Sequence, residues 1–359
     1  MTALKDRLIA RIARTGPISV ADYMSTCLLD PEHGYYATRD PLGAGGDFTT
    51  APEISQMFGE CLGLALAQCW IDRGRPDPFH LVELGPGRGV LMADMLRATA
   101  RIPGFHEAMR LYLIEASGPL RAIQQRRLQG YGATWLRALS GLPDDAPLFL
   151  IANEFLDALP IRQFVRAGGG WRERQIGVSD GALAFGLGGP VLPEALACRL
   201  TDTDEGQVVE LCLPALALVG DIARRIARAG GVAVLIDYGG GRSLGDTLQA
   251  VRRHAPAPVL ACPGEADLTA HVDFGAIARA ARAVPGVRVT VMTPQGRLLE
   301  RLGITARAER LAQGLQGAAL QSHIAAHRRL THPDEMGTLF KAIALCREDA
   351  APVPPGFDI

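Results

Sequence analysis

The sequence predicts a doubly wound α/β fold, in which helices cover both faces of a mostly parallel sheet of seven strands. From about residue 78, short apolar runs alternate with helical segments, and this alternation is typical of parallel sheets. The run that ends at Leu84 passes directly into the glycine-rich turn Gly85-Pro86-Gly87-Arg88-Gly89, as expected for a strand that leads into a ligand-binding helix. The expected strands cover residues 80–85, 110–115, 134–139, 147–152, 231–237, 287–293 and 337–346.

The composition is that of a globular protein long enough to bury a large core. Of its 359 residues 48% are hydrophobic, so we do not expect a disordered chain. A formal net charge of -1 provides no positive field for a phosphate backbone, so no nucleic acid partner is expected. No apolar run is long enough to insert into a membrane, and the N-terminus lacks the apolar core of a secretion signal. The seven cysteines include no Cys-x-x-Cys pair, so we expect neither disulfides nor a metal site, and we expect a cytoplasmic protein.

Residues 1–75 predict an N-terminal helical region with a glycine-rich interruption. Ser19 precedes one expected helix and Ser55 opens another. The segment between them, residues 43–53, is rich in glycine and includes Asp47 and Thr49. Such a segment is either a flexible connection or a loop that folds over a ligand.

The distance between the strands expected at 147–152 and 231–237 is far longer than one crossover helix requires. Short alternating runs at 163–166, 170–176 and 183–186 are separated by glycines, which predicts antiparallel hairpins. A helix over 215–229 then returns the chain to the sheet. We therefore expect an N-terminal helical part at 1–75, a core formed by 76–162 and 230–359, and an inserted β subdomain with its returning helix at 163–229.

The glycine spacing indicates a nucleotide-type cofactor but differs from the spacing of a dinucleotide-binding site. A dinucleotide fingerprint places its third glycine at the sixth position, which is Val90 when the count starts at Gly85, whereas Gly89 is at the fifth. Glu83 stands at the entrance of the turn, and Glu115 ends the second expected strand, where a carboxylate accepts hydrogen bonds from ribose hydroxyls. The alternative is an ordinary turn between a strand and a helix.

Polar residues also follow two further expected strands, and ligands of doubly wound sheets lie beyond these carboxyl ends. Asn153, Glu154 and Asp157 come after one strand, and Asp237 and Tyr238 follow another. Carboxylates bind a planar guanidinium cation in a bidentate manner, so these positions would suit a guanidinium as the acceptor of a transferred group. The alternative is a helix N-terminus that Asn153 caps.

Two interpretations also stay open for the segment from Asp267 to Phe274. Either Asp267 or Thr269 caps a helix that continues through residue 283, or His271 and Asp273 bind substrate at the rim of a pocket.

Taken together, these segments resemble the MidA family of S-adenosylmethionine (SAM)-dependent methyltransferases, and the turn from Glu83 resembles motif I of class I methyltransferases. The matching segments run in the same order over nearly the whole chain: Pro31–Tyr36, Gly46–Ser55, Glu83–Gly89, Asn153–Pro160, Ile236–Gly239, Asp267–Phe274 and Met336–Lys341. The resemblance implies a Rossmann-like class I methyltransferase fold, SAM as the methyl donor and an arginine of a partner protein as the acceptor. The mitochondrial member of the family takes part in the assembly of respiratory complex I, which makes a complex I subunit the expected partner.

From these observations we assign expected roles to fifteen residues. The expected catalytic residues are Asn153, Glu154, Asp157 and Asp237. The expected cofactor-binding residues are Asp47, Thr49, Glu83, Gly85, Pro86, Gly87, Gly89 and Glu115. The expected substrate-binding residues are Tyr238, His271 and Asp273. Two other functions stay open: a non-catalytic assembly chaperone with a vestigial cofactor pocket, and a methyltransferase that acts on small molecules.

Overall fold

The computed structural model describes residues 3–38 and 49–359, which fall into two compact units. The first unit combines residues of Met1–Phe48, Asp157–Ala215 and Arg242–Asp273, and the second combines Thr49–Leu156, Leu216–Gly241 and Phe274–Ile359. These units divide the chain differently from the expected domains. Residues 49–75 belong to the second unit with the large sheet, whereas 242–273 belong with the expected insertion. The hydrophobic clusters explain this division, because the N-terminal helices share an apolar core with the hairpins.

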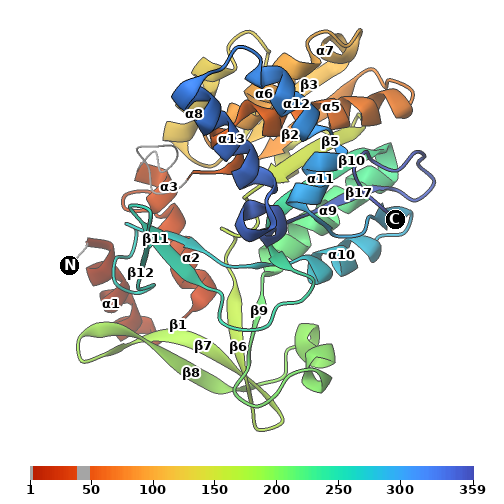
Figure 1. Cartoon of the computed structure of the whole chain (residues 1–359). Helices are drawn as coiled ribbons and strands as arrows, with labels where there is room; N and C mark the ends of the chain where they lie inside the picture. Colours follow the sequence, from red (N-terminus) through yellow and green to blue (C-terminus); the bar gives the residue numbers. More distant parts are fainter. Residues whose placement is uncertain (1–2, 39–48) are drawn as a thin grey trace. The chain divides into compact units, whose positions relative to one another are not determined.

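Seven strands of the second unit form one sheet in the order β15-β17-β10-β5-β2-β3-β4 (Figure 1). Strands β10, β5, β2, β3 and β4 are parallel, and β17 runs antiparallel to both β10 and β15. All seven expected strands are therefore confirmed, although the short β16 (Thr293–Pro294) pairs with β17 separately. Their bounds are Phe79–Leu84 (β2), Met109–Ile114 (β3), Thr134–Leu136 (β4), Leu148–Asn153 (β5), Gly231–Gly240 (β10), Val287–Val289 (β15) and Phe340–Arg347 (β17).

Helices lie on both faces of this sheet, as the doubly wound pattern predicts (Figure 1). They are α4 (Ala51–Ile54), α5 (Gln56–Asp72), α6 (Val90–Thr99), α7 (Phe105–Ala108), α8 (Gly118–Arg127), α9 (Leu213–Ala229), α10 (Phe274–Arg282), α11 (Gln295–Arg301), α12 (Ile304–Ala312) and α13 (Gly317–Thr331). The expectation of a helix from Asp267 or Thr269 was wrong. Both residues lie in strand β13 (Asp267–Thr269), and α10 begins only at Phe274. None of the helices described here has the length and apolarity that crossing a bilayer requires.

The core of the second unit lies around the two central strands. Every residue of β2 and of β5 is buried, because near-continuous apolar runs suit strands that are covered on both faces. The rings of Phe79 and Phe149, from neighbouring strands, meet edge to face with centroids 5.2 Å apart. Trp70 of α5 and Phe105 of α7 also pack on this pair. Aromatic packing of this kind fixes the helices against the sheet.

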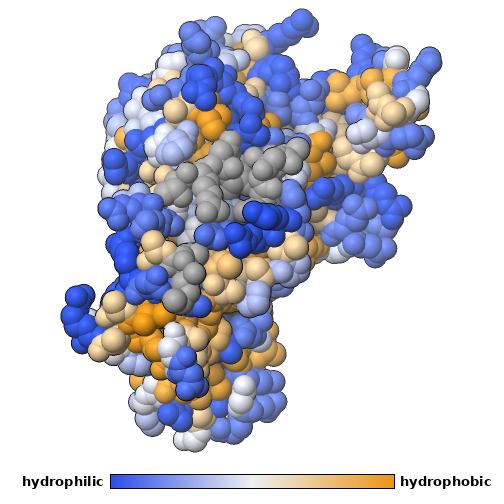
Figure 2. Space-filling model, turned by 90° about the vertical axis from the view of Figure 1, so that its left-hand side faces the viewer, coloured by the Kyte–Doolittle hydropathy of each residue, from blue (hydrophilic) through white to orange (hydrophobic). Residues whose placement is uncertain are grey.

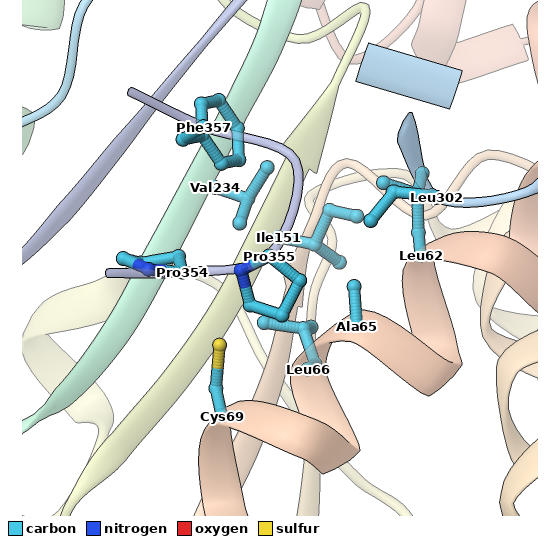
Figure 3. Close-up of a pocket in the computed structure, with 10 residues that line it drawn as sticks. All are labelled: Leu62, Ala65, Leu66, Cys69, Ile151, Val234, Leu302, Pro354, Pro355 and Phe357. Atoms are coloured by element: carbon cyan, nitrogen blue, oxygen red, sulfur yellow. The ribbon is translucent and has the colours of Figure 1, made fainter. Parts of the chain in front are cut away.

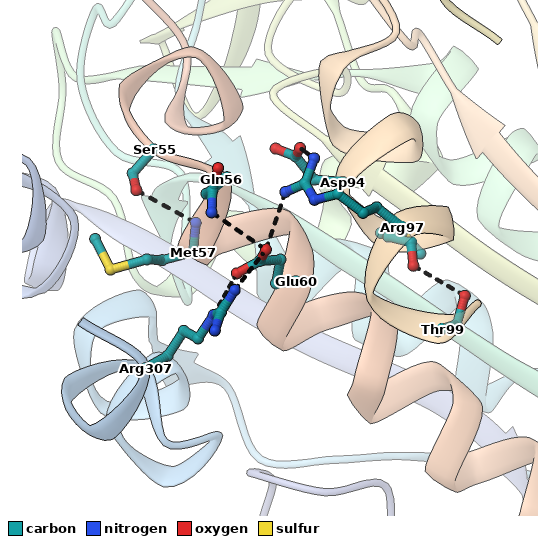
Figure 4. A network of polar contacts seen from close by, with 9 residues as sticks. Ser55, Gln56, Met57, Glu60, Asp94, Arg97, Thr99 and Arg307 are labelled. Atoms are coloured by element: carbon teal, nitrogen blue, oxygen red, sulfur yellow. Dashed lines mark hydrogen bonds and ion pairs between the residues drawn. The ribbon is translucent and has the colours of Figure 1, made fainter. Parts of the chain in front are cut away.

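An ion-pair network around the buried Glu60 joins three helices of the second unit (Figure 4). Glu60 of α5 accepts hydrogen bonds from Arg97 of α6 at 2.9 Å and from Arg307 of α12 at 2.6 Å. Burial alone would raise the pKa of Glu60, but the two guanidinium groups lower it below its usual value. Because Glu60 stays ionised, the network connects the N-terminal part of α5 with the last turn of α6.

The first unit contains two smaller sheets. Its hairpin strands are β6 (Arg162–Ala167), β7 (Gly170–Ser179) and β8 (Ala182–Val191), which confirms the expected antiparallel hairpins. The sequence did not predict their partners β1 (Ile18–Ser19) and β9 (Val208–Leu211), nor β11 (Gln249–Arg252) and β12 (Ala255–Ala257) of the second small sheet. The two-residue strand β14 (Val272–Asp273) belongs to neither of these sheets. The helices are α1 (Ala3–Thr15), α2 (Val20–Leu29) and α3 (Tyr35–Thr38). As expected, Ser19 caps α2, and its side chain forms a capping box with Asp22.

Apolar side chains are exposed along β8. Phe185, Leu187 and Val191 are each more than a third exposed, and Leu192 just beyond the strand is 75% exposed. Figure 2 shows that orange, apolar side chains also gather in places on the face of the molecule that it presents. The guanidinium of Arg174 lies 4.2 Å from the ring centroid of Phe185 and covers part of this surface.

The aromatic cluster predicts the result of a truncation in the core. Phe79→Ala should lower the free energy of unfolding by about 3 to 5 kcal/mol, because it removes a ring that contacts Trp70, Phe105 and Phe149. Leu64→Ala on α5, where the side chain is 49% exposed, should cost less than about 0.5 kcal/mol. Chemical unfolding followed by circular dichroism measures both. Equal losses for the two variants would contradict the assigned core.

Candidate functional site

The turn after β2 has the backbone conformation that the glycines predict. Gly85, Gly87 and Gly89 have φ angles of 59°, 53° and 75°, in the left-handed region that favours glycine. A Cβ at Gly85 would lie 2.5 Å from Cδ2 of Phe155, so the position has no room for a side chain. The turn closes through a hydrogen bond from the N–H of Gly89 to the carbonyl of Pro86, at 2.7 Å. Helix α6 begins directly afterwards, which directs its N-terminus towards the carboxyl edge of the sheet.

Glu83 lies next to the end of β2 and is 3% exposed. Burial, reinforced by the nearby Glu115, raises its pKa to about 8, and a hydrogen bond from the N–H of Met92 only partly opposes this. Its Oε2 atom is buried and has no hydrogen-bond partner among the described residues. A buried acceptor without a donor is costly, so this oxygen is suited to a ligand that brings a donor.

Glu115 follows β3 and is held by donors on both of its oxygens. Oε1 accepts a hydrogen bond from the N–H of Ser117 at 2.8 Å, and Oε2 accepts one from Nε2 of Gln124 at 3.1 Å. Burial raises the pKa of Glu115, and these donors oppose the shift. Sequence reasoning missed Gln124, because a glutamine in the middle of a polar helix such as α8 gives no signal of its own.

The turn after β5 is fixed by the neighbouring strand β10. The N–H of Glu154 donates to the carbonyl of Ile236 at 3.0 Å. The carboxylate of Asp237 accepts the N–H groups of Phe155 and Leu156, at 3.2 and 2.9 Å. No helix begins after Asn153, so the interpretation of this residue as a helix cap was wrong. Asp237 holds the turn in place through these contacts, and a catalytic role for it stays a prediction.

Glu154 combines an unusual backbone with a restrained carboxylate. Its φ of 49° is uncommon for a residue with a side chain, and such strain is often found at functional sites. Its Oε1 accepts hydrogen bonds from the N–H of Ala51 at 2.8 Å and from Nδ2 of Asn153 at 3.0 Å. Burial raises its pKa to about 7, against the effect of these donors and of the positive charge of Arg329. The C-terminal end of the glycine-rich segment therefore contacts the expected catalytic carboxylate.

The other expected site residues make different contacts, belong to the first unit or fall outside the described residues. Tyr238 is buried, and its ring packs against that of Phe340 with centroids 5.5 Å apart. Asp157, His271 and Asp273 belong to the first unit, where the N–H of Ser243 donates to the carboxylate of Asp273 at 3.0 Å. Thr49 is partly exposed at the start of the second unit. Asp47 lies outside the described residues.

A separate cavity of the second unit is lined by apolar side chains (Figure 3). Its walls come from α5, from β5 and β10, and from the C-terminal segment with Pro354, Pro355 and Phe357. Figure 3 shows the C-terminal segment passing across α5 and these strands. With no ionisable group but the thiol of Cys69 in its lining, the cavity is unsuited to methyl-transfer chemistry.

The residues at the carboxyl edge fit a cofactor of the adenosyl type. Oδ1 of Asn153 is buried without a described partner, as is Oε2 of Glu83, so the site offers acceptors where a ligand must supply donors. The ammonium group and the ribose hydroxyls of SAM are donors of this kind. The glycine turn supplies backbone N–H groups and space, and Glu115 supplies a carboxylate for a ribose.

Comparison with known proteins decides what kind of site this is. The model of the S-adenosyl-L-methionine-dependent methyltransferase family matches residues 61–293. The chain belongs to this family. Its cofactor is therefore SAM, and family membership favours an enzyme over a non-catalytic assembly chaperone.

Relatives match nearly the whole chain. The mitochondrial protein arginine methyltransferase NDUFAF7 of Danio rerio is 36% identical over 363 residues, which cover 93% of this chain and 84% of that protein. The NDUFAF7 protein of Homo sapiens is 34% identical, with coverage of 96% and 83%. A Burkholderia thailandensis protein crystallised with S-adenosyl-homocysteine has a TM-score of 0.85 and 33% identity, covering 99% of this chain and 94% of its own. The native crystal structure of a Burkholderia thailandensis protein gives a TM-score of 0.82 at 32% identity, with the same coverage.

The buried state of Glu83 predicts a pH-dependent stability. Its pKa rises from the usual 4.5 to about 8 on folding, so the folded state binds this proton more tightly than the unfolded chain does. The stability that this protonation supports is complete below pH 4.5 and is lost as the pH rises to about 8. Glu83→Gln removes this ionisation. Without ligand, the melting temperature of the variant should therefore rise relative to that of the wild type as the pH increases from 5 to 8.5.

Glu309→Gln, at an exposed position of α12, is the control and should show no such trend. Melting curves measured by calorimetry across this pH range test the prediction. A constant difference between Glu83→Gln and the wild type would contradict the buried protonated state.

Proposed function

We propose that this protein transfers the methyl group of SAM to an arginine side chain of a partner protein. The observation that carries the proposal is the strained, partly buried Glu154 directly after β5, the strand that pairs with β2 and therefore ends beside the glycine turn. The names of the relatives that are 34 to 36% identical, all protein arginine methyltransferases, support the same acceptor.

The reaction is an in-line displacement at the methyl carbon. Bound SAM supplies an electrophilic methyl group on a positively charged sulfur. The bond from sulfur to methyl breaks, a bond from an arginine nitrogen to the methyl forms, and that nitrogen loses a proton, so the products are S-adenosylhomocysteine and methylarginine. The protein must hold the nitrogen behind the methyl group and receive the proton.

Glu154 is the residue best suited to hold the acceptor. A guanidinium remains protonated at any ordinary pH, so only an ionised carboxylate pairs with it strongly. Ala51 and Asn153 both donate to Oε1 of Glu154 and fix the plane of its carboxylate. Oδ1 of Asn153, buried without a described partner, offers a second acceptor for an N–H group of the acceptor. Asp237 acts through the turn it holds, and so is a positioning residue.

We further propose a respiratory complex I subunit as the partner and the cytoplasm as the compartment. The partner is supported by the order of shared motifs that resembles the MidA family. The compartment is supported by the cysteines, because all seven are free thiols, as expected in a reducing environment.

The proposed role of Glu154 predicts a clear separation of binding and transfer. With methyl-labelled SAM and cell lysate, the wild type should label a discrete protein band, and hydrolysis of that band should yield methylarginine. Glu154→Gln should reduce this labelling at least about a hundredfold, because an amide cannot pair with the cation. Its affinity for S-adenosylhomocysteine, measured by calorimetry, should stay within about threefold of the wild type.

Labelling that survives in Glu154→Gln would remove this residue from its proposed role. Label found only in small molecules, or methyl groups found on residues other than arginine, would contradict the proposed acceptor.

The pKa of Glu154 predicts the pH dependence of the reaction. Burial raises this pKa from 4.5 to about 7, and the ionised form is the one that binds the cation. The value of kcat/KM should therefore fall as the pH drops through 7 and level off above about 8. Initial rates between pH 5.5 and 9 give this profile. A rate that does not change between pH 6 and 8 would show that Glu154 does not control the reaction by ionisation.

A further inference from the structure

We propose that Gln124 is a positioning residue that sets the affinity for the cofactor, because it holds the glycine turn and Glu115 in one arrangement. The inference concerns SAM binding alone and does not depend on the identity of the methyl acceptor.

Three hydrogen bonds place Gln124 at the centre of the cofactor site. Its Nε2 donates to the carbonyl of Gly87 at 2.7 Å and to Oε2 of Glu115 at 3.1 Å. Its Oε1 accepts the N–H of the Trp135 indole at 2.9 Å. The side chain is fully buried, and its Cγ lies 3.5 Å from the Cβ position of Gly89. One amide group therefore contacts the glycine turn and Glu115, the two elements that are expected to bind opposite ends of the ligand.

The orientation of this amide is fixed by Trp135. An indole N–H can only donate, so the atom it contacts must be the oxygen of the amide. The NH₂ group then has to face Gly87 and Glu115, which are both acceptors. A flipped amide would place an oxygen against a carbonyl and a carboxylate at once. Trp135 thus orients the Gln124 amide towards the carbonyl of Gly87 and the carboxylate of Glu115.

The contact with Gln124 has a direct consequence for Glu115. This carboxylate is buried, and burial raises its pKa, whereas donors such as Gln124 and Ser117 favour the charged form. An ionised carboxylate accepts two hydroxyl hydrogen bonds, but a protonated one gives up an acceptor position. Gln124 therefore keeps Glu115 in the state and in the rotamer that a ribose requires.

Gln124→Glu is the sharpest test, because it keeps the size and the acceptor for Trp135 but replaces both donated hydrogen bonds with a negative charge. In this variant the introduced carboxylate and that of Glu115 repel each other, which favours the uptake of a proton by one of them. The proton then restores a hydrogen-bond donor between the two groups. The affinity of Gln124→Glu for S-adenosylhomocysteine should be at least about tenfold weaker than that of the wild type at pH 8.5, and should recover partly at pH 6. In the wild type the affinity should be constant or fall towards pH 6, because burial raises the pKa values of Glu83 and Glu115 and either carboxylate loses an acceptor position when it takes up a proton.

Three further variants complete the experiment. Gln124→Met has a similar volume but no donor, so it should weaken binding about tenfold at both pH values. Trp135→Phe leaves the glutamine in place and frees its amide to turn, so it should weaken binding by a smaller factor. Gln125→Glu carries the same charge change on the exposed side of α8 and should leave the affinity unchanged.

Isothermal calorimetry with S-adenosylhomocysteine at pH 6 and 8.5 measures all four variants, and melting temperatures show that they are folded. The opposite pH trends of Gln124→Glu and the wild type would support the positioning role. If Gln124→Met is folded and binds as tightly as the wild type, the proposal is wrong. It is equally wrong if Gln124→Glu loses affinity without any recovery at pH 6, because the residue would then serve only the packing of α8.

Discussion

The parallel pairing of β2, β5 and β10 is the constraint on which the site depends. In parallel strands the carboxyl ends meet at one edge, and the register here aligns Leu84 with Ala152 and Asn153 with Ile236. The residues that follow these positions are the glycine turn, Glu154 and Asp237. A shift of one residue in either pairing would turn Glu83 or Asn153 to the opposite face of the sheet. The fully buried strands β2 and β5 make such a shift costly, so the core also determines the geometry of the site.

The site holds several carboxyl groups under conditions that disfavour their charge. Burial raises the pKa values of Glu83, Glu115 and Glu154, and Glu154 adds a strained backbone. A protein without a ligand to bind would gain stability by replacing these groups with apolar ones. Perturbed carboxyl groups at a sheet edge are instead typical of functional sites, where a bound cation or donor recovers part of the cost. The methyl donor of this family brings both a positive charge and several donors.

The sequence predicted the parts of the structure that depend on local pattern. The seven strands follow from apolar runs, and Gly85, Gly87 and Gly89 follow from a turn that only glycine accommodates. Glu154 was predicted from its place after a strand, and the structure adds its contact with Ala51, about a hundred residues away in the sequence. The missed features depend on long-range contacts. Strand β1 is two residues long and pairs with β7, and Gln124 gains its role only through Gly87, Glu115 and Trp135. One interpretation made Asp267 or Thr269 the cap of a helix, because such residues often cap helices, but pairing with β11 places both in a strand.

The roles assigned to the site residues all depend on SAM binding at the carboxyl edge of β2, β3 and β5. A crystal structure of this protein with S-adenosylhomocysteine tests this binding directly. We expect density for the ligand against the turn from Gly85 to Gly89, with the ribose within hydrogen-bond distance of Glu115. Density for the ligand elsewhere, or protein side chains filling this edge in crystals saturated with the ligand, would contradict it.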